Sequence, residues 1–146
     1  MVKDLLIALF ATAGYCLLVN VPRRLLLPAA FGGALSWGMY LLLREHVESI
    51  FFLIVVVSAG CAVYSELAAK VAKAPATIFL IPGLIPLVPG SYVYYMMSAL
   101  VQNDAAGMKQ YGVLTAQWAL GLAAGISIIA VIRQIIDRLL RRKKSM

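Results

Sequence analysis

One apolar stretch contains four of the chain's six prolines, and this stretch limits the possible folds more than any other feature. It reads APATIFLIPGLIPLVPG and runs from Ala74 to Gly90. Proline removes a backbone N–H and clashes with the preceding helical turn, at a cost of about 3 kcal/mol in a helix interior. A bilayer requires the protein itself to satisfy every backbone polar group. The stretch therefore has the composition of a membrane span but cannot form one regular helix.

Five long stretches without charged residues, here called gaps, run along the chain. Of its 146 residues 63% are hydrophobic and 13% are charged, whereas about a quarter of a soluble domain is charged. A membrane-spanning helix needs about 20 apolar residues. Four of the five gaps fit one span each, and the gap from Ala74 to Asn103 is too long for one simple helix. We therefore predict an all-α integral membrane protein with five transmembrane segments, the fourth broken by a Pro/Gly-rich unwound loop. The predicted spans of this single membrane domain are about 5–21, 25–43, 48–67, 75–102 (broken) and 110–133, with a basic tail at 134–146.

The basic residues predict the orientation of these spans. With five spans, ten basic residues fall on one side and three on the other. Since basic loops stay in the cytoplasm, this places the N-terminus outside and the C-terminus in the cytoplasm. If the fourth segment instead entered and left on one face, the split would be eight to five, so five spans are favoured. The cytoplasmic set is Arg23, Arg24, Lys70, Lys73, Arg133, Arg138, Arg141, Arg142, Lys143 and Lys144, and the outer set is Lys3, Arg44 and Lys109.

Within the fourth segment the prolines predict two half-helices. Pro75 suits the first position of a helix that reaches about Leu80. The closely spaced prolines and glycines from Pro82 to Gly90 predict an unwound loop. Ser91 is expected to cap a second helix that ends near Val101.

Such a break is typical of secondary transporters. In them, the positive N-terminus of a half-helix meets an anionic group and unwound carbonyls contact a cation or substrate. The N–H groups near Ser91, Tyr92 and Val93 are therefore a candidate anion site. The alternative is a proline-kinked packing helix that binds no ligand.

Several short motifs lie between Ser65 and about Asp104. They are Glu66, the run Lys73–Thr77, Pro82–Gly83, Pro86–Gly90 and Tyr94–Tyr95. Together they resemble the second membrane half of the threonine/serine exporter family, a half that is a separate small protein in split members. The resemblance implies a bacterial inner-membrane exporter of small amino acids, or of dicarboxylates such as succinate, driven by an ion or proton gradient. Tyr92 departs from the family pattern, which commonly has a small residue there, and this bears on substrate size.

A second chain is also expected. Transporters with broken helices are often built from two inverted repeats, and this sequence contains one broken segment. The expected partner is a larger membrane subunit of opposite orientation, with a homo-oligomer as the alternative.

Glu66 is the candidate proton carrier, because ionisable side chains within membrane segments are rare and usually have a function. The alternative is an interfacial ion pair with Lys70, four residues on. Lys70 and Lys73 are interpreted as snorkelling anchors, with attraction of an anionic substrate as the alternative for Lys73. The candidate substrate- or ion-binding residues are Glu66, Pro82, Gly83, Pro86, Pro89, Gly90, Ser91 and Tyr95, with Lys73 as a possible anion attractor.

The remaining polar and small residues suggest packing roles. Gly121 and Gly125 permit close helix contact, either within the chain or with a partner. Trp37 and Trp118 fall well inside their segments and are interpreted as packing or cavity residues, and Asp104 as a loop charge. Cys16 and Cys61 resemble small core residues.

These features exclude several function classes. The sequence shows no nucleophile–base arrangement typical of an enzyme, no metal-ligand spacing and no sign of a cofactor. Its net charge of +7 suits anionic lipid better than nucleic acid. The preferred function is the small subunit of a two-component secondary transporter that exports small carboxylate-bearing metabolites. A non-transporting assembly subunit and a homo-oligomeric channel are the alternatives.

Overall fold

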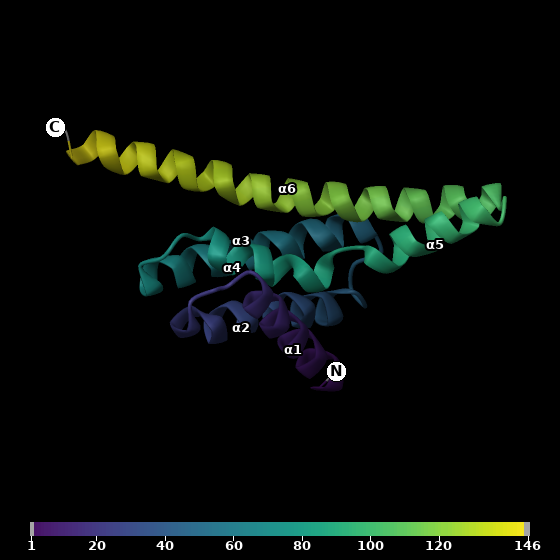
Figure 1. Ribbon diagram of the computed structural model, residues 1–146. Coiled ribbons are helices and arrows are strands. Elements are labelled where there is room, and N and C mark those ends of the chain that lie inside the picture. Colours follow the sequence, from purple (N-terminus) through teal and green to yellow (C-terminus); the bar gives the residue numbers. More distant parts are fainter. Residues whose placement is uncertain (1, 145–146) are drawn as a thin grey trace.

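The computed structural model describes residues 2–144; the side chains of residues 137 and 140–144 are not described. Every element in this part of the chain is helical, and the helices form one elongated body (Figure 1). The elements are α1 (Val2–Leu18), α2 (Arg23–Leu43), α3 (Ile50–Ala72), α4 (Thr77–Leu84), the short 3-10 helix η1 (Ile85–Leu87), α5 (Gly90–Val101) and α6 (Ala105–Lys144).

Three tight turns join these helices in pairs. Asn20, Lys73 and Asn103 each adopt a left-handed backbone, with φ of 55°, 51° and 56°. The residue after each donates its N–H to the carbonyl five positions earlier, which is the Schellman arrangement that ends helices. Asparagine tolerates this backbone, whereas lysine adopts it less readily. The chain therefore reverses direction at each of these turns. They join α1 to α2, α3 to α4, and α5 to α6. The three hydrogen bonds join Val21 to Cys16 (2.9 Å), Ala74 to Ala69 (3.1 Å) and Asp104 to Ala99 (2.9 Å).

Three helices, α2, α3 and α6, are long and apolar enough to cross a membrane. The segments Thr77–Leu87 and Gly90–Val101 meet the same criteria as a pair, and they are bent by 48° at the break between them. Such a pair is either a broken span or a re-entrant loop. With its 17 residues, α1 is at the lower limit of the roughly 17–25 residues that span a bilayer. The structure therefore supports a helical membrane protein with three to four candidate spans, and the count of five stays a prediction.

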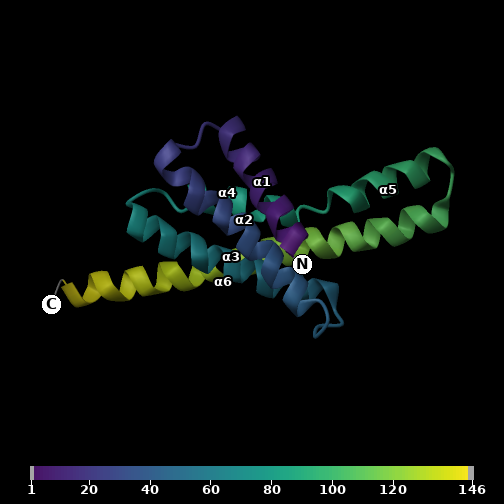
Figure 2. The same cartoon turned by 90° about the horizontal axis from the view of Figure 1, so that it is seen from below.

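The helices form a body with one protruding hairpin. In Figure 1, α6 runs along one side of α3 and extends past it at both ends. Helix α4 packs mainly on α2 and also on α3, whereas α5 packs on the first part of α6. The view from below shows the hairpin of α5 and α6 extending away from α1 and α2 (Figure 2). The break between α4 and α5 is therefore the point where the fourth segment leaves the body.

Glycines on α6 make its contact with α3 close. A Cβ on Gly121 would lie 3.0 Å from both Ile54 Cβ and the Phe51 carbonyl oxygen, and one on Gly125 would overlap Ser58 Oγ and the Val55 carbonyl oxygen. The sequence left open whether this pair packs within the chain or against a partner. In the structure it packs within the chain.

Helix α6 is longer than the sequence predicted. It begins at Ala105 and continues to Lys144, through the region predicted as a tail. Asp104 is not merely a loop charge, because its Oδ1 accepts the Gly107 N–H at 3.0 Å and so caps the helix. The basic residues beyond Ile132 are good helix formers and lie at the helix end that favours cations. The tail side chains of Arg141, Arg142, Lys143 and Lys144 lie outside the described residues.

Candidate transport site

The break in the fourth segment is shorter than predicted. Helix α4 continues through Pro82 and Gly83 to Leu84, η1 follows, and α5 begins at Gly90. The expected unwound loop from Pro82 to Gly90 is therefore wrong, and only Val88 and Pro89 separate η1 from α5. Tighter hydrogen bonds explain the difference. Ile85 donates its N–H to the Pro82 carbonyl and Val88 to the Ile85 carbonyl at 3.2 Å, so three-residue turns replace most of the expected loop.

A buried hydroxyl satisfies one of the carbonyls near the end of α4. Ser36 on α2 is fully buried, and its Oγ lies 2.6 Å from the Gly83 carbonyl oxygen and 3.0 Å from that of Gly33. Carbonyls in the last turn of a helix lack their helical donors, so this hydroxyl replaces a missing N–H. The sequence did not indicate Ser36 in this role.

At Gly83, α4 approaches α2 and α3 closely. A Cβ there would lie 2.7 Å from Cys61 Sγ on α3, while the next atoms, in Gly32 on α2, are 3.6 Å away or more. Pro82 and Gly83 are both buried. This part of the candidate site is thus a packed junction of α2, α3 and α4.

The N-terminus of α5, in contrast, faces outward. Gly90 and Ser91 are exposed, and a Cβ on Gly90 would meet no atom within 4 Å of the described structure. Pro89 occupies the capping position, without a side-chain hydrogen bond in this described region. Ser91 is therefore not the cap that the sequence predicted, because α5 begins at Gly90, two residues before the start that a Ser91 cap implies. An uncapped helix N-terminus carries a partial positive charge and attracts anions.

A chain of aromatic rings packs against one side of the first turn of α5. The Tyr92 ring centre lies 5.8 Å from that of Trp118, which lies 5.5 Å from Tyr40, and Tyr40 stacks on Trp37 at 5.0 Å. Trp118 is 5% exposed, and its Nε1 has no hydrogen-bond partner in the described part of the chain. Trp118 is thus a packing residue and Tyr92 packs against it, whereas Trp37 stacks on Tyr40 and also lines a cavity.

Tyr95 lies further along α5 and supports the hairpin. Its ring centre is 5.4 Å from that of Tyr111 on α6 and 5.6 Å from that of Tyr94. Its side chain remains 49% exposed. Tyr95 is therefore available to a partner or ligand on the outer side of the hairpin.

Glu66 lies on a different face of the molecule from the break. Its Oε1 is 2.5 Å from Nη1 of Arg133, so it pairs with α6, whereas Cys61 on the same helix faces Gly83. The carboxylate is 22% exposed and the guanidinium 52%. Sequence reasoning considered Lys70 as the partner and missed Arg133, because only the packing of α3 on α6 joins residues 67 positions apart.

Two further candidates are Lys73, at the end of α3, and Pro86, within η1. Lys73 forms the left-handed end of α3 and is exposed, where its charge suits the negative helix end. Pro86 lines a cavity of about 300 Å³ together with Asp4 and Trp37. The structure thus brings Pro82 and Gly83 together in the core, places Pro86 and Pro89 beside the break, and leaves Glu66 apart.

A family model described as Threonine/Serine exporter, ThrE, matches residues 4–132, which is most of the chain and covers all or part of each helix in the described structure. No curated protein and no solved structure matches the sequence. The match covers the broken segment as well as the apolar helices on either side of it. The chain therefore belongs to the threonine/serine exporter family of membrane transport proteins.

Proposed function

We propose that this protein is the small subunit of a two-component secondary transporter that exports small carboxylate-bearing metabolites. Membership of the threonine/serine exporter family supports amino acid export. Dicarboxylates such as succinate share the carboxylate that the proposed site would bind, and we include them in the proposed substrate range. Transport would be coupled to an ion or proton gradient across a bacterial inner membrane.

The break between α4 and α5 is the observation that carries the proposal. The two pieces are bent by 48°, and the first turn of α5 is exposed and lacks a side-chain cap within the described residues. Backbone N–H groups at such an end bind carboxylates. In a transporter, broken helices place these groups near the bilayer midplane, where repeats meet.

The protruding hairpin supports a partner subunit. The outer side of α5 exposes Tyr94, Met97 and Val101, and the helix departs from α1 and α2 (Figure 2). One broken segment supplies half of the site that inverted-repeat transporters build from two. A larger subunit of opposite orientation would supply the other half, and two chains of different mass in the purified complex would distinguish it from a homo-oligomer.

Metabolite efflux tests the proposed function. Cells that lack this chain should retain threonine, serine or a dicarboxylate after loading, and a plasmid copy of the wild-type gene should restore efflux. The strain must carry no second exporter for the same compound. Efflux of every small amino acid and dicarboxylate at the wild-type rate in the deletion strain would refute transport.

The role of Glu66 can be separated from its ion pair with Arg133. We expect Glu66→Gln to change stability by less than about 1 kcal/mol, since the pair is partly exposed, and to abolish the response of efflux to an imposed pH gradient. Arg133→Gln is the matched control, because it removes the same pair and keeps the carboxylate. We expect Arg133→Gln to retain gradient-driven efflux. Equal losses in both variants would assign Glu66 a structural role instead.

A further inference from the structure

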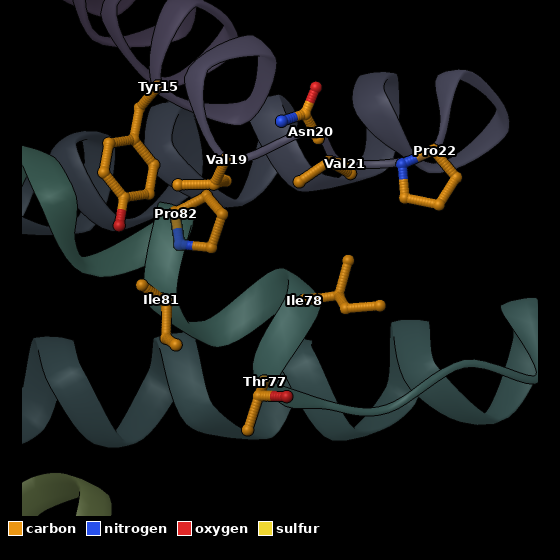
Figure 3. Close-up of a pocket in the computed structure, with 9 residues that line it drawn as sticks. All are labelled: Tyr15, Val19, Asn20, Val21, Pro22, Thr77, Ile78, Ile81 and Pro82. Carbon is orange, nitrogen blue, oxygen red and sulfur yellow. The ribbon is translucent and has the colours of Figure 1, made fainter.

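A cavity on the side of the bundle away from α6 lies between the end of α1 and the start of α4. It has a volume of about 270 Å³ and is lined by the residues shown as sticks in Figure 3. One wall is formed by the end of α1 and the α1–α2 turn, and the facing wall by the first two turns of α4. On its outer side Val19 and Ile81 are 49% and 52% exposed, so the cavity opens toward the surroundings of the bundle.

The lining is mainly apolar. Six of its nine residues are valine, isoleucine or proline, and the other three are Tyr15, Asn20 and Thr77. Figure 3 shows the Asn20 amide turned away from Ile78 and Thr77. Sites that enclose a whole small molecule have volumes of roughly 300–1,000 Å³. An open apolar groove of this size suits part of a larger amphiphile, such as one segment of an acyl chain.

Three basic residues adjoin the lining of this groove along the chain. Arg23 and Arg24 directly follow Pro22 in the lining, and Lys73 precedes the turn that leads to Thr77. The two turns lie at the same end of the bundle, because Val21, Ala74 and Ala76 pack against one core cluster. The members of this cluster are Cys16, Leu25, Ala29, Ala69 and Phe79.

The two arginines occupy an unfavourable place in the helix. They form the first turn of α2, which contains no acidic residue and whose cap Pro22 makes no side-chain hydrogen bond in this described part. The positive end of the helix dipole repels cations there, whereas an anion would be attracted both by the free N–H groups and by the guanidinium groups. The charge arrangement is thus complementary to an anionic headgroup next to an apolar groove.

We propose that this groove binds an anionic phospholipid, with an acyl segment against Val19, Ile78 and Ile81 and the phosphate at Arg23 and Arg24. Basic pockets between membrane helices bind such headgroups on the cytoplasmic side, which is the side that the positive-inside rule assigns to these arginines. The proposal needs only the membrane location of the chain. It remains independent of which metabolite is exported.

Native mass spectrometry of the purified protein tests the headgroup. Phosphatidylglycerol is titrated against phosphatidylcholine and soluble glycerol phosphate. We expect saturable binding of phosphatidylglycerol, weakened about tenfold or more when Arg23→Gln and Arg24→Gln are combined. Lys109→Gln, which removes one exposed charge elsewhere, should leave binding unchanged. Equal affinity for phosphatidylcholine would overturn the headgroup assignment, and glycerol phosphate binding as tightly as the lipid would identify a free-phosphate site.

Filling the groove tests the acyl segment. Ile81→Trp should prevent saturable phosphatidylglycerol binding, whereas Leu18→Trp, on an 81% exposed residue outside the lining, should not. If Ile81→Trp lowers the melting temperature, Val19→Trp on the opposite wall replaces it. Unchanged lipid affinity in a folded groove variant, or equal loss in Leu18→Trp, would refute the groove.

Discussion

Gly83→Ala is expected to reduce metabolite efflux to the level of a strain that lacks the protein. The added Cβ would lie 2.7 Å from Cys61 Sγ, so either the buried thiol must rotate or α4 must move away from α3, and a moved α4 lengthens the Ser36 hydrogen bond to the Gly83 carbonyl. Overpacking of this kind costs about 1–3 kcal/mol. The displaced segment leads directly into η1 and the break. Efflux from complemented cells and the melting temperature in detergent measure the two effects.

Two companion variants make this prediction specific. Gly90→Ala should retain wild-type stability, because a Cβ there meets no atom of the described structure within 4 Å. Combining Gly83→Ala with Cys61→Ala should restore much of the loss, since the other neighbours of that Cβ are at ordinary distances of 3.6 Å and 3.7 Å. Coupling between contacting residues of this kind is measured by a double-mutant cycle. A Gly83→Ala protein with full efflux would show that the α3–α4 contact is not required.

Gly125→Ala is expected to lower the melting temperature more than Gly83→Ala does. Its Cβ would overlap a backbone atom, the Val55 carbonyl oxygen, as well as Ser58 Oγ. A side chain can rotate away, but a backbone atom inside α3 cannot move without separating α3 from α6. The variant should therefore assemble poorly in the membrane, as measured by yield in the membrane fraction and by thermal unfolding.

The rescue behaviour of Gly125→Ala should differ from that of Gly83→Ala. Adding Ser58→Ala removes the hydroxyl and leaves the Val55 carbonyl oxygen, so stability should stay well below wild type. Gly14→Ala is the control, because a Cβ on that exposed glycine of α1 meets nothing within 4 Å of the described atoms. Full recovery on removal of the Ser58 hydroxyl would contradict the close backbone approach of the two helices.

The sequence predicted the positions of the helices better than their ends. Uncharged gaps located α2 and the broken fourth segment within a few residues, because hydropathy and charge act locally. The ends of α3 and α6 were misplaced, since Lys70 and the basic tail residues are charged but still continue a helix. Charge ends an apolar gap without ending the helix that contains it.

The candidate site was predicted only in part, because its main contacts depend on tertiary packing. The prolines indicated an interruption of the segment, and the structure is bent by 48° there. The sequence did not indicate that α4 passes through Pro82 or that Ser36 donates to the Gly83 carbonyl. The pairing of Glu66 with Arg133 depends equally on tertiary packing. One sequence contains no signal for contacts between residues 47 or 67 positions apart.

The functional account depends most on whether the fourth segment crosses the membrane in two pieces, so that its break lies at membrane depth. Single cysteines at Lys70 and Gln102 flank that segment, and both positions are exposed. The native Cys16 and Cys61 are fully buried, so the wild type provides the background. In intact cells, a membrane-impermeant maleimide should label Gln102→Cys at once and Lys70→Cys only after permeabilisation. Labelling of both positions from the same side would show a re-entrant loop and contradict the crossing.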